Sequence, residues 1–208
     1  MADRVLHVYD WVPEFARGHV RDLRIRWALE EAGLSYQVVL VPFKDRQEPA
    51  HLAQQPFGQV PWLTEGGEAV FESGAILLHL AQRSVILLPP EARAKAVQWL
   101  FAALNSVEGA FSPWTLMKST GAEDGKMREH VERGMRRKLD TLERELASRD
   151  WIAGPFSVAD IALAAVMRFA DRSGAFVEHP ACAAYLARAT DRPAFKKALA
   201  DQLALYTD

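Results

Sequence analysis

An acid and a hydroxyl stand side by side at Glu72-Ser73, where a short apolar run ends and a helical pattern begins. A helix start binds anions because its first backbone N–H groups have no partners within the helix. The serine hydroxyl adds a donor, and the neighbouring carboxylate suits an ammonium group. Together with the backbone beside the proline at Val60-Pro61, the pair can hold a small peptide that carries both an amine and carboxylates. Ser73 is also an ordinary helix cap, a role that leaves N–H groups free for such a ligand.

The elements that must position this pair alternate between strand and helix. Apolar and β-branched residues predict strands at residues 5–9 and 36–41. Apolar side chains at helical spacing predict a helix over residues 18–32. A hairpin over residues 61–71 and a helix that starts at Ser73 complete this part of the chain.

The second half of the chain is predicted to be helical. Apolar residues recur there at steps of three and four, as one face of an amphipathic helix requires, at Val131, Met135, Leu139, Leu142 and Leu146. Ser157 followed by Asp160 is a capping signal for another helix. Pro180 and Pro193 stand where later helices are expected to start.

A stiff segment with two adjacent prolines, Leu87-Leu88-Pro89-Pro90, separates the two patterns. We therefore predict an α/β domain over residues 1–83, a linker over residues 84–90 and an all-α domain over residues 91–208.

Composition is that of an ordinary globular chain. Half of the 208 residues are hydrophobic and a quarter are charged, which is enough for a sizeable core. The net charge of −2 gives no reason to expect nucleic acid or an anionic membrane as a partner. No apolar run approaches the roughly 20 residues of a membrane span, and residues 1–4 lack a signal-peptide core. The single cysteine, Cys182, excludes an internal disulfide and suits the reducing cytoplasm. The histidines show no metal-ligand spacing, so we predict no metal site.

Four segments, in this order, resemble the cytosolic glutathione S-transferases. They are residues 24–33, residues 56–61, the Glu72-Ser73 pair and residues 151–161. The resemblance covers essentially the whole chain but assigns no transferase class. It implies a thioredoxin-like N-terminal domain that binds glutathione, followed by a helical domain that carries the wall of a second-substrate pocket.

The resemblance also implies how glutathione is held as a co-substrate. Val60-Pro61 would be a cis peptide, a form that only an X–Pro bond adopts at low cost. The Val60 N–H and C=O would then pair with the cysteinyl backbone of glutathione, and Glu72 and Ser73 would engage its γ-glutamyl end. Gln59 and Lys44 are further candidate contacts, Lys44 to the glycine carboxylate. Without the resemblance, the proline would be a trans residue starting an edge strand.

Glutathione chemistry needs a thiolate, whereas a free cysteine thiol has a pKa of about 8.5. The family supplies a hydrogen-bond donor at the end of the first strand or the start of the first helix. Tyr9 carries the only side-chain hydroxyl between Met1 and Leu34, so it is the first candidate donor. A packed tyrosine without a catalytic role would look the same in the sequence. Other candidate donors in the same stretch are Trp11, Arg17, His19 and backbone N–H groups near residues 15–18.

The electrophile pocket in this family lies between the two domains. Its candidate wall residues here are Trp11, Phe15, Asn105, Glu108, Phe111 and Trp114. The last two could equally be core or dimer contacts. An apolar wall implies a hydrophobic electrophile, which the thiolate would attack by addition or by halide displacement. The resemblance further implies a homodimer with a role in detoxification.

Two other functions remain open at this point. An isomerase, dehalogenase or peroxidase would share the glutathione thiolate and differ only in the pocket. A non-catalytic module for ligand carriage or protein assembly would keep the fold alone. A reductase that uses its own cysteine is disfavoured, because Cys182 lies in the helical half of the chain.

Overall fold

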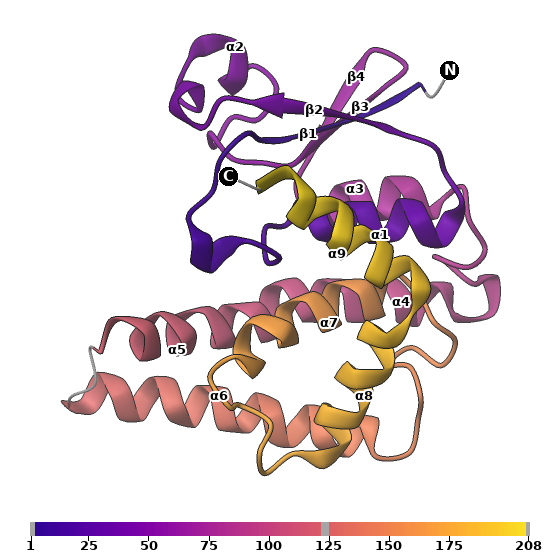
Figure 1. Ribbon diagram of the computed structural model, residues 1–208. Coiled ribbons are helices and arrows are strands. Elements are labelled where there is room, and N and C mark those ends of the chain that lie inside the picture. Colours follow the sequence, from indigo (N-terminus) through magenta and orange to yellow (C-terminus); the bar gives the residue numbers. More distant parts are fainter. Residues whose placement is uncertain (1–2, 122–124, 207–208) are drawn as a thin grey trace. The chain divides into compact units, whose positions relative to one another are not determined.

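The computed structural model describes residues 3–121 and 125–206 (Figure 1). The chain forms two compact units. The sheet unit comprises Met1–Leu87 together with Pro193–Asp208, and the helical unit comprises Leu88–Arg192. Each unit has its own buried core and is described separately.

A four-stranded mixed sheet forms the centre of the sheet unit. Its strands are β1 (Arg4–Tyr9), β2 (Gln37–Val41), β3 (Trp62–Glu65) and β4 (Glu68–Phe71), in the order β2-β1-β3-β4. β1 pairs in parallel with β2 and antiparallel with β3, and β3 pairs antiparallel with β4. Leu6 and Val8 of the central strand β1 are fully buried, because both lie on the covered face of the sheet. The strands predicted from the sequence are confirmed.

Helices α1 (Asp22–Ala32) and α3 (Ser73–Ala81) pack against each other and against the sheet, whereas the short α2 (Pro49–Leu52) lies away from them (Figure 1). Gly33 ends α1 in the left-handed conformation, with φ 63°. The predicted start of this helix at residue 18 is wrong. Gly18 has φ 76°, which a continuing helix does not allow, and a short 3-10 turn at Glu14–Ala16 comes before it.

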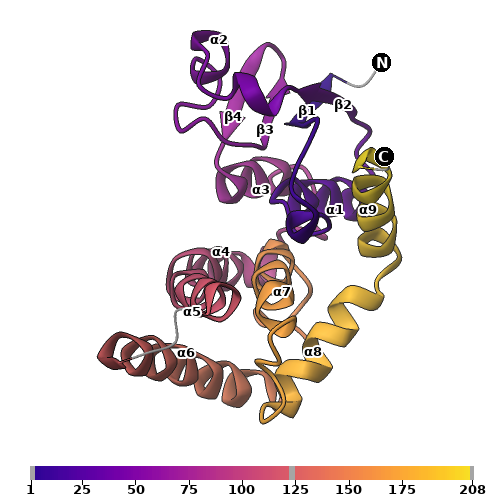
Figure 2. The ribbon, with the colours of Figure 1, turned by 60° about the vertical axis from the view of Figure 1, so that its left-hand side comes forward.

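The last helix, α9 (Pro193–Leu203), lies against α1 within the sheet unit (Figure 2). The rings of Trp27 and Phe195 meet edge to face with centroids 4.9 Å apart. The Lys197 ammonium lies 3.0 Å from the Glu30 carboxylate. The structure therefore differs from the predicted boundaries of 1–83 and 91–208, because α9 packs on α1 and belongs to the sheet unit.

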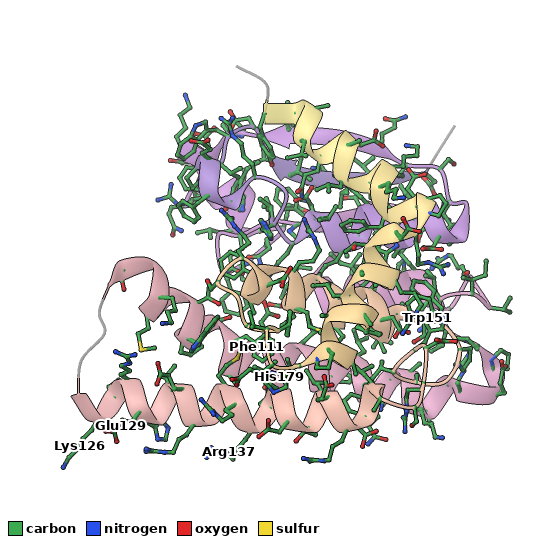
Figure 3. The ribbon with its side chains drawn as sticks, turned by 60° about the horizontal axis from the view of Figure 1, so that its bottom comes forward. Phe111, Lys126, Glu129, Arg137, Trp151 and His179 are labelled. Carbon is green, nitrogen blue, oxygen red and sulfur yellow. The ribbon has the colours of Figure 1, made fainter. Side chains whose placement is uncertain are left out.

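The helical unit contains α4 (Arg93–Phe101), a π-helical segment (Ala102–Val107), α5 (Glu108–Thr120), α6 (Gly125–Leu146), α7 (Val158–Asp171) and α8 (Pro180–Asp191). Met135, Leu139, Leu142 and Leu146 of the predicted stripe on α6 are buried. Lys126, Glu129 and Arg137 project from α6 on the side away from Phe111 (Figure 3). The helix starts predicted at Pro180 and Pro193 are confirmed.

The predicted cap at the start of α7 is also confirmed. The Ser157 hydroxyl accepts a hydrogen bond from the Ala159 N–H at 3.3 Å. The Asp160 carboxylate accepts one from the Ser157 N–H at 2.9 Å, which completes a capping box. Among the described residues, no helix is both long and apolar enough to cross a membrane.

Candidate functional site

The turn that precedes β3 presents an open stretch of backbone. The Val60-Pro61 peptide is cis, as the sequence comparison with the family implied. Within residues 3–121 and 125–206, neither the N–H nor the C=O of Val60 has a hydrogen-bond partner. A backbone donor and acceptor on one residue are what an extended peptide needs to pair with as it would with a neighbouring strand.

Three side chains from β1 and the α2 region hold this turn in place. The Gln55 carbonyl oxygen accepts hydrogen bonds from the Phe57 N–H at 2.7 Å and the Gln59 N–H at 3.2 Å. The Nε2 atom of His51 lies 3.0 Å from the Gln59 carbonyl, so the ring is protonated at that nitrogen. The Tyr9 hydroxyl donates to the Gly58 carbonyl at 2.6 Å. The open Val60 backbone is therefore part of a preorganised turn.

Gly58 is required by the geometry of the turn. Its φ is 63°, and a Cβ atom added there would lie 2.6 Å from the Arg46 carbonyl oxygen. Real Cβ contacts are not that short, so any side chain would displace the turn from Arg46.

The Glu72-Ser73 pair lies at the start of α3, as predicted. Glu72 is exposed, and its side chain makes no capping bond. Its φ of 70° is the single positive value among the non-glycine residues that the structure describes. Such a conformation costs of order 1–3 kcal/mol and is commonly found where a functional site requires it. The exposed carboxylate is therefore available to an ammonium group.

Ser73 is buried, and its hydroxyl accepts a hydrogen bond from the guanidinium of Arg24 at 3.3 Å. Arg24 is itself 5% exposed and comes from α1. A buried cation beside the N-terminus of α3 adds to the attraction of that helix end for a carboxylate. Arg24 was not among the residues predicted for the site, because one arginine among the charged residues of an amphipathic helix carries no distinguishing signal.

Lys44 lies on the 3-10 turn Phe43–Asp45 and is exposed. No ion pair involves it in the described part of the chain. The turn itself is fixed by the Asp10 carboxylate, which accepts a hydrogen bond from the Phe43 N–H at 2.9 Å.

The structure gives the Tyr9 hydroxyl a partner other than a thiol. The hydroxyl donates a hydrogen bond to the Gly58 carbonyl. The ring of Tyr9 is buried in a cluster with Val12, Val60, Trp62 and Tyr206. Burial raises the pKa of Tyr9, and the nearby Arg46 charge opposes that rise. Tyr9 is therefore a neutral donor whose hydrogen bond shapes the turn, and its role as thiol donor stays a prediction.

The other candidate donors lie on the segment between β1 and α1. Trp11 is exposed, and its ring meets Phe43 edge to face at 5.4 Å between centroids. Arg17 and His19 are half-buried, and Phe15 is exposed on the 3-10 turn. We call residues 10–21 the thiol loop.

The six candidate electrophile-pocket residues fall into two groups. Trp11 and Phe15 belong to the sheet unit, and the remaining four belong to the helical unit. Asn105 is exposed on the π-helical segment and Glu108 is half-buried, whereas Phe111 and Trp114 are buried within the helical unit. The burial of Phe111 and Trp114 fits a core position as well as a pocket wall, the alternatives that the sequence left open. A common pocket stays a prediction.

Cys182 does not provide a reactive thiol. It is fully buried near the start of α8, and burial together with the Glu143 carboxylate raises its pKa to about 12. A thiol must ionise to act as a nucleophile, so this one is inert. Among the described residues, no group of histidine, cysteine and carboxylate side chains could hold a metal ion.

Comparisons with known proteins identify the family of this chain. The family described as "Glutathione S-transferase, N-terminal domain" matches residues 5–82, and "Glutathione S-transferase, C-terminal domain" matches residues 127–188. Glutathione S-transferase 3 of Zea mays is 31% identical over 195 residues, which cover 86% of this chain and 88% of that protein.

Two bacterial proteins extend the comparison. Disulfide-bond oxidoreductase YfcG of Escherichia coli (strain K12) is 32% identical over 154 residues, covering 67% of this chain and 71% of that protein. A glutathione transferase from Pseudomonas putida, with one glutathione disulfide bound per subunit, has a TM-score of 0.80 and 26% identity, with 95% of this chain and 91% of that chain covered. The sequence matches span both units and the structural match shows the same fold, so this chain belongs to the glutathione S-transferase family.

Proposed function

We propose that the protein is a glutathione transferase that joins the glutathione thiolate to hydrophobic electrophiles. The observation that carries this proposal is the unpaired Val60 backbone, on a turn that three side chains fix, in the same unit as the Arg24–Ser73 pair. Glutathione is a peptide that matches both features. It offers a cysteinyl backbone for Val60 and a γ-glutamyl group for α3.

Each end of glutathione has a candidate partner in this arrangement. The γ-glutamyl carboxylate would bind the Ser73 hydroxyl and the first N–H groups of α3, with the Arg24 charge close by. The exposed Glu72 would bind the ammonium group. Gln59 and Lys44 are further contacts in the proposal, Lys44 to the glycine carboxylate. These contacts orient the cysteine so that its sulfur faces the thiol loop.

The thiol loop would stabilise the thiolate through a hydrogen-bond donor among Tyr9, Trp11, Arg17, His19 and the backbone N–H groups near residues 15–18. The reaction forms one bond between sulfur and an electrophilic carbon. The thiol proton passes to solvent, and the carbon either releases a halide or gains a proton after addition. Positioning and thiolate formation supply the catalysis.

The first test is the pKa of the glutathione thiol bound to the protein, measured by thiolate ultraviolet absorbance across pH. We expect a pKa well below the free value of about 8.5. Conjugation of an activated aryl halide should accompany that shift. Binding without any shift would overturn the transferase proposal in favour of ligand carriage.

Tyr9→Phe separates the two roles of that residue. If the hydroxyl serves the turn, the Kd for glutathione should rise while the pKa of the bound thiol stays the same. If the hydroxyl donates to the thiolate, the thiol pKa should rise with little change in Kd. Ser73→Ala is the control for the other end of the ligand and should weaken binding only.

A second candidate function is reduction of disulfides by way of glutathione. It is favoured by the similarity to a disulfide-bond oxidoreductase and to a structure that contains glutathione disulfide. The inert Cys182 means that any mixed disulfide would form between glutathione and the substrate. Turnover of a small disulfide, with conjugation absent, would favour this function.

We further propose that the protein forms a homodimer in the cytoplasm. Phe57 and Phe71 are exposed on the sheet unit with ring centroids 6.3 Å apart, and such an apolar pair is suited to contact with a second copy. Light scattering measures the state directly, and a monomer at every concentration would contradict the proposal.

A further inference from the structure

The C-terminal segment contacts the thiol loop at three separate points, although the two lie at opposite ends of the sequence. We propose that residues 199–206, which we call the C-terminal strap, position the thiol loop for activation of the glutathione sulfur. This inference rests on the proposed function. It assigns a positioning role to Gln202, Leu199 and Tyr206.

The first contact is made by Gln202 of α9, whose side chain is fully buried. Its amide NH₂ donates to the Val20 carbonyl at 3.2 Å and to the Asp22 carboxylate at 2.6 Å. Asp22 is the first residue of α1 and also accepts a hydrogen bond from Arg26 at 2.8 Å. One amide therefore joins the last part of the thiol loop to the start of the helix that follows.

The second contact lies at Gly18. A Cβ atom added there would be 3.3 Å from Leu199 Cδ1 and 3.6 Å from Leu203 Cδ2. The loop backbone therefore passes directly against the leucines of α9. Glycine is favoured by the φ of 76°, and a Cβ atom there would press on Leu199.

The third contact lies at Tyr206, which is 6% exposed. Its ring belongs to the cluster that contains Tyr9, Val12, Val60 and Trp62. This cluster connects the thiol loop, through Val12, with the open backbone of Val60. Tyr206 thus belongs to the cluster that joins the segment proposed to bind the cysteinyl backbone with the segment proposed to hold the sulfur.

The thiol loop depends on these contacts because it has little regular structure of its own. Between β1 and α1 the structure describes only the three-residue turn Glu14–Ala16 as helical. A donor acts on a thiolate only when it is held close to the sulfur, and a misplacement of about 1 Å in a catalytic group costs on the order of a hundredfold in rate. The strap therefore adds a fixed surface to a segment that has little regular structure.

The test uses the full-length variant Gln202→Leu, which keeps the side-chain size and removes both hydrogen bonds. The control is Lys197→Gln, which removes an exposed ion pair on the same helix and touches no part of the thiol loop. Both proteins are measured for the Kd of glutathione, the pKa of the bound thiol, and thermal unfolding by circular dichroism.

For Gln202→Leu we expect the pKa of the bound thiol to rise toward the free value, with a roughly tenfold weaker Kd. The control should match the wild type in both. If Gln202→Leu is folded and its bound thiol has the wild-type pKa, the inference is wrong. A wild type that fails to bind glutathione would instead overturn the proposed function.

Gln202→Leu could fail to fold, because it leaves the buried Asp22 with fewer partners. Leu199→Ala is the second variant, since Leu199 is only half-buried and its loss leaves the polar contacts intact. It should raise the bound-thiol pKa by a smaller amount than Gln202→Leu. An unchanged pKa in folded Leu199→Ala would contradict the strap.

Discussion

Two buried aspartates, one in each unit, hold the start of a helix in different ways. Asp22 is the first residue of α1 and Asp160 the third of α7, and both are fully buried. Asp160 accepts hydrogen bonds from the Ile152 N–H at 2.9 Å, the Ser157 N–H at 2.9 Å and the Tyr185 hydroxyl at 2.8 Å. Asp22 has a buried ion pair with Arg26 and an amide partner, Gln202, that lies 180 residues away.

The two hydrogen-bond networks differ in how far apart their partners lie in the sequence. The partners of Asp160 come from segments near it in the sequence, so its network stabilises the helical unit alone. The partners of Asp22 come from α1 and from the C-terminal strap, so its network also fixes one end of the thiol loop. We therefore expect changes at Asp160 to alter stability, and changes at Asp22 to alter stability and glutathione activation together.

The largest effect is expected for Asp22→Ala. It leaves the Arg26 guanidinium, which is 2% exposed, without its counter-charge. Removing one partner of a buried ion pair typically costs about 3–5 kcal/mol of unfolding free energy. Urea denaturation measures this loss, and binding of glutathione should weaken in the same variant.

The double variant Asp22→Ala/Arg26→Met is the check on that reason. It removes both charges and fills the space with an apolar side chain, so it should recover part of the lost stability. If the double variant loses more unfolding free energy than the two single variants lose together, charge pairing is not the cause.

A smaller effect is expected from pH at Asp160. Burial raises the pKa of Asp160 from the ordinary value of 3.8 to about 6, whereas the hydrogen bonds from Ile152 and Tyr185 lower it. A carboxyl group with a raised pKa contributes most to stability when protonated, so its contribution is full below pH ~4 and falls as the pH rises to about 6.

Asp160→Asn isolates this contribution. The stability of the wild type relative to the variant should fall by roughly 3 kcal/mol between pH 4 and 6 and stay constant above. Asp150→Asn, which changes an exposed carboxylate in the same unit, is the control variant. Parallel curves for the wild type and Asp160→Asn would contradict the raised pKa.

The smallest effect is expected for Tyr185→Phe. This variant removes one neutral donor to Asp160 and keeps the ring in place, so it should cost about 1 kcal/mol. Chemical denaturation measures the loss. Glutathione binding should be unchanged. A change in the bound-thiol pKa would contradict the conclusion that the Asp160 network stabilises the helical unit alone.

The same contrast explains what the sequence could predict. The Ser157–Asp160 cap, the hairpin, the helix stripes and the Glu72-Ser73 pair all depend on neighbours within a few residues, so their patterns are visible in one sequence. The cis Val60-Pro61 peptide was expected only because of the family resemblance.

The contacts of the candidate site that sequence reasoning missed depend on distant partners. Arg24 meets Ser73 across 49 residues, and Gln202 meets Val20 across 182. The Tyr9 hydroxyl donates a hydrogen bond to the Gly58 carbonyl, 49 residues away. No periodicity or motif in a single sequence specifies such pairs, and for this reason neither the packing of α9 on α1 nor the Tyr9–Gly58 hydrogen bond could be predicted.

The division of the sheet unit between both ends of the chain has a consequence for synthesis. A ribosome makes the whole helical unit after β4 and α3 but before α9. Until residue 202 emerges, the buried end of α1 has no amide partner and the segment after β1 has no helix to rest on. The sheet unit therefore begins to be translated first but completes its fold last. We expect its N-terminal part to remain accessible to chaperones and proteases until α9 has been synthesised.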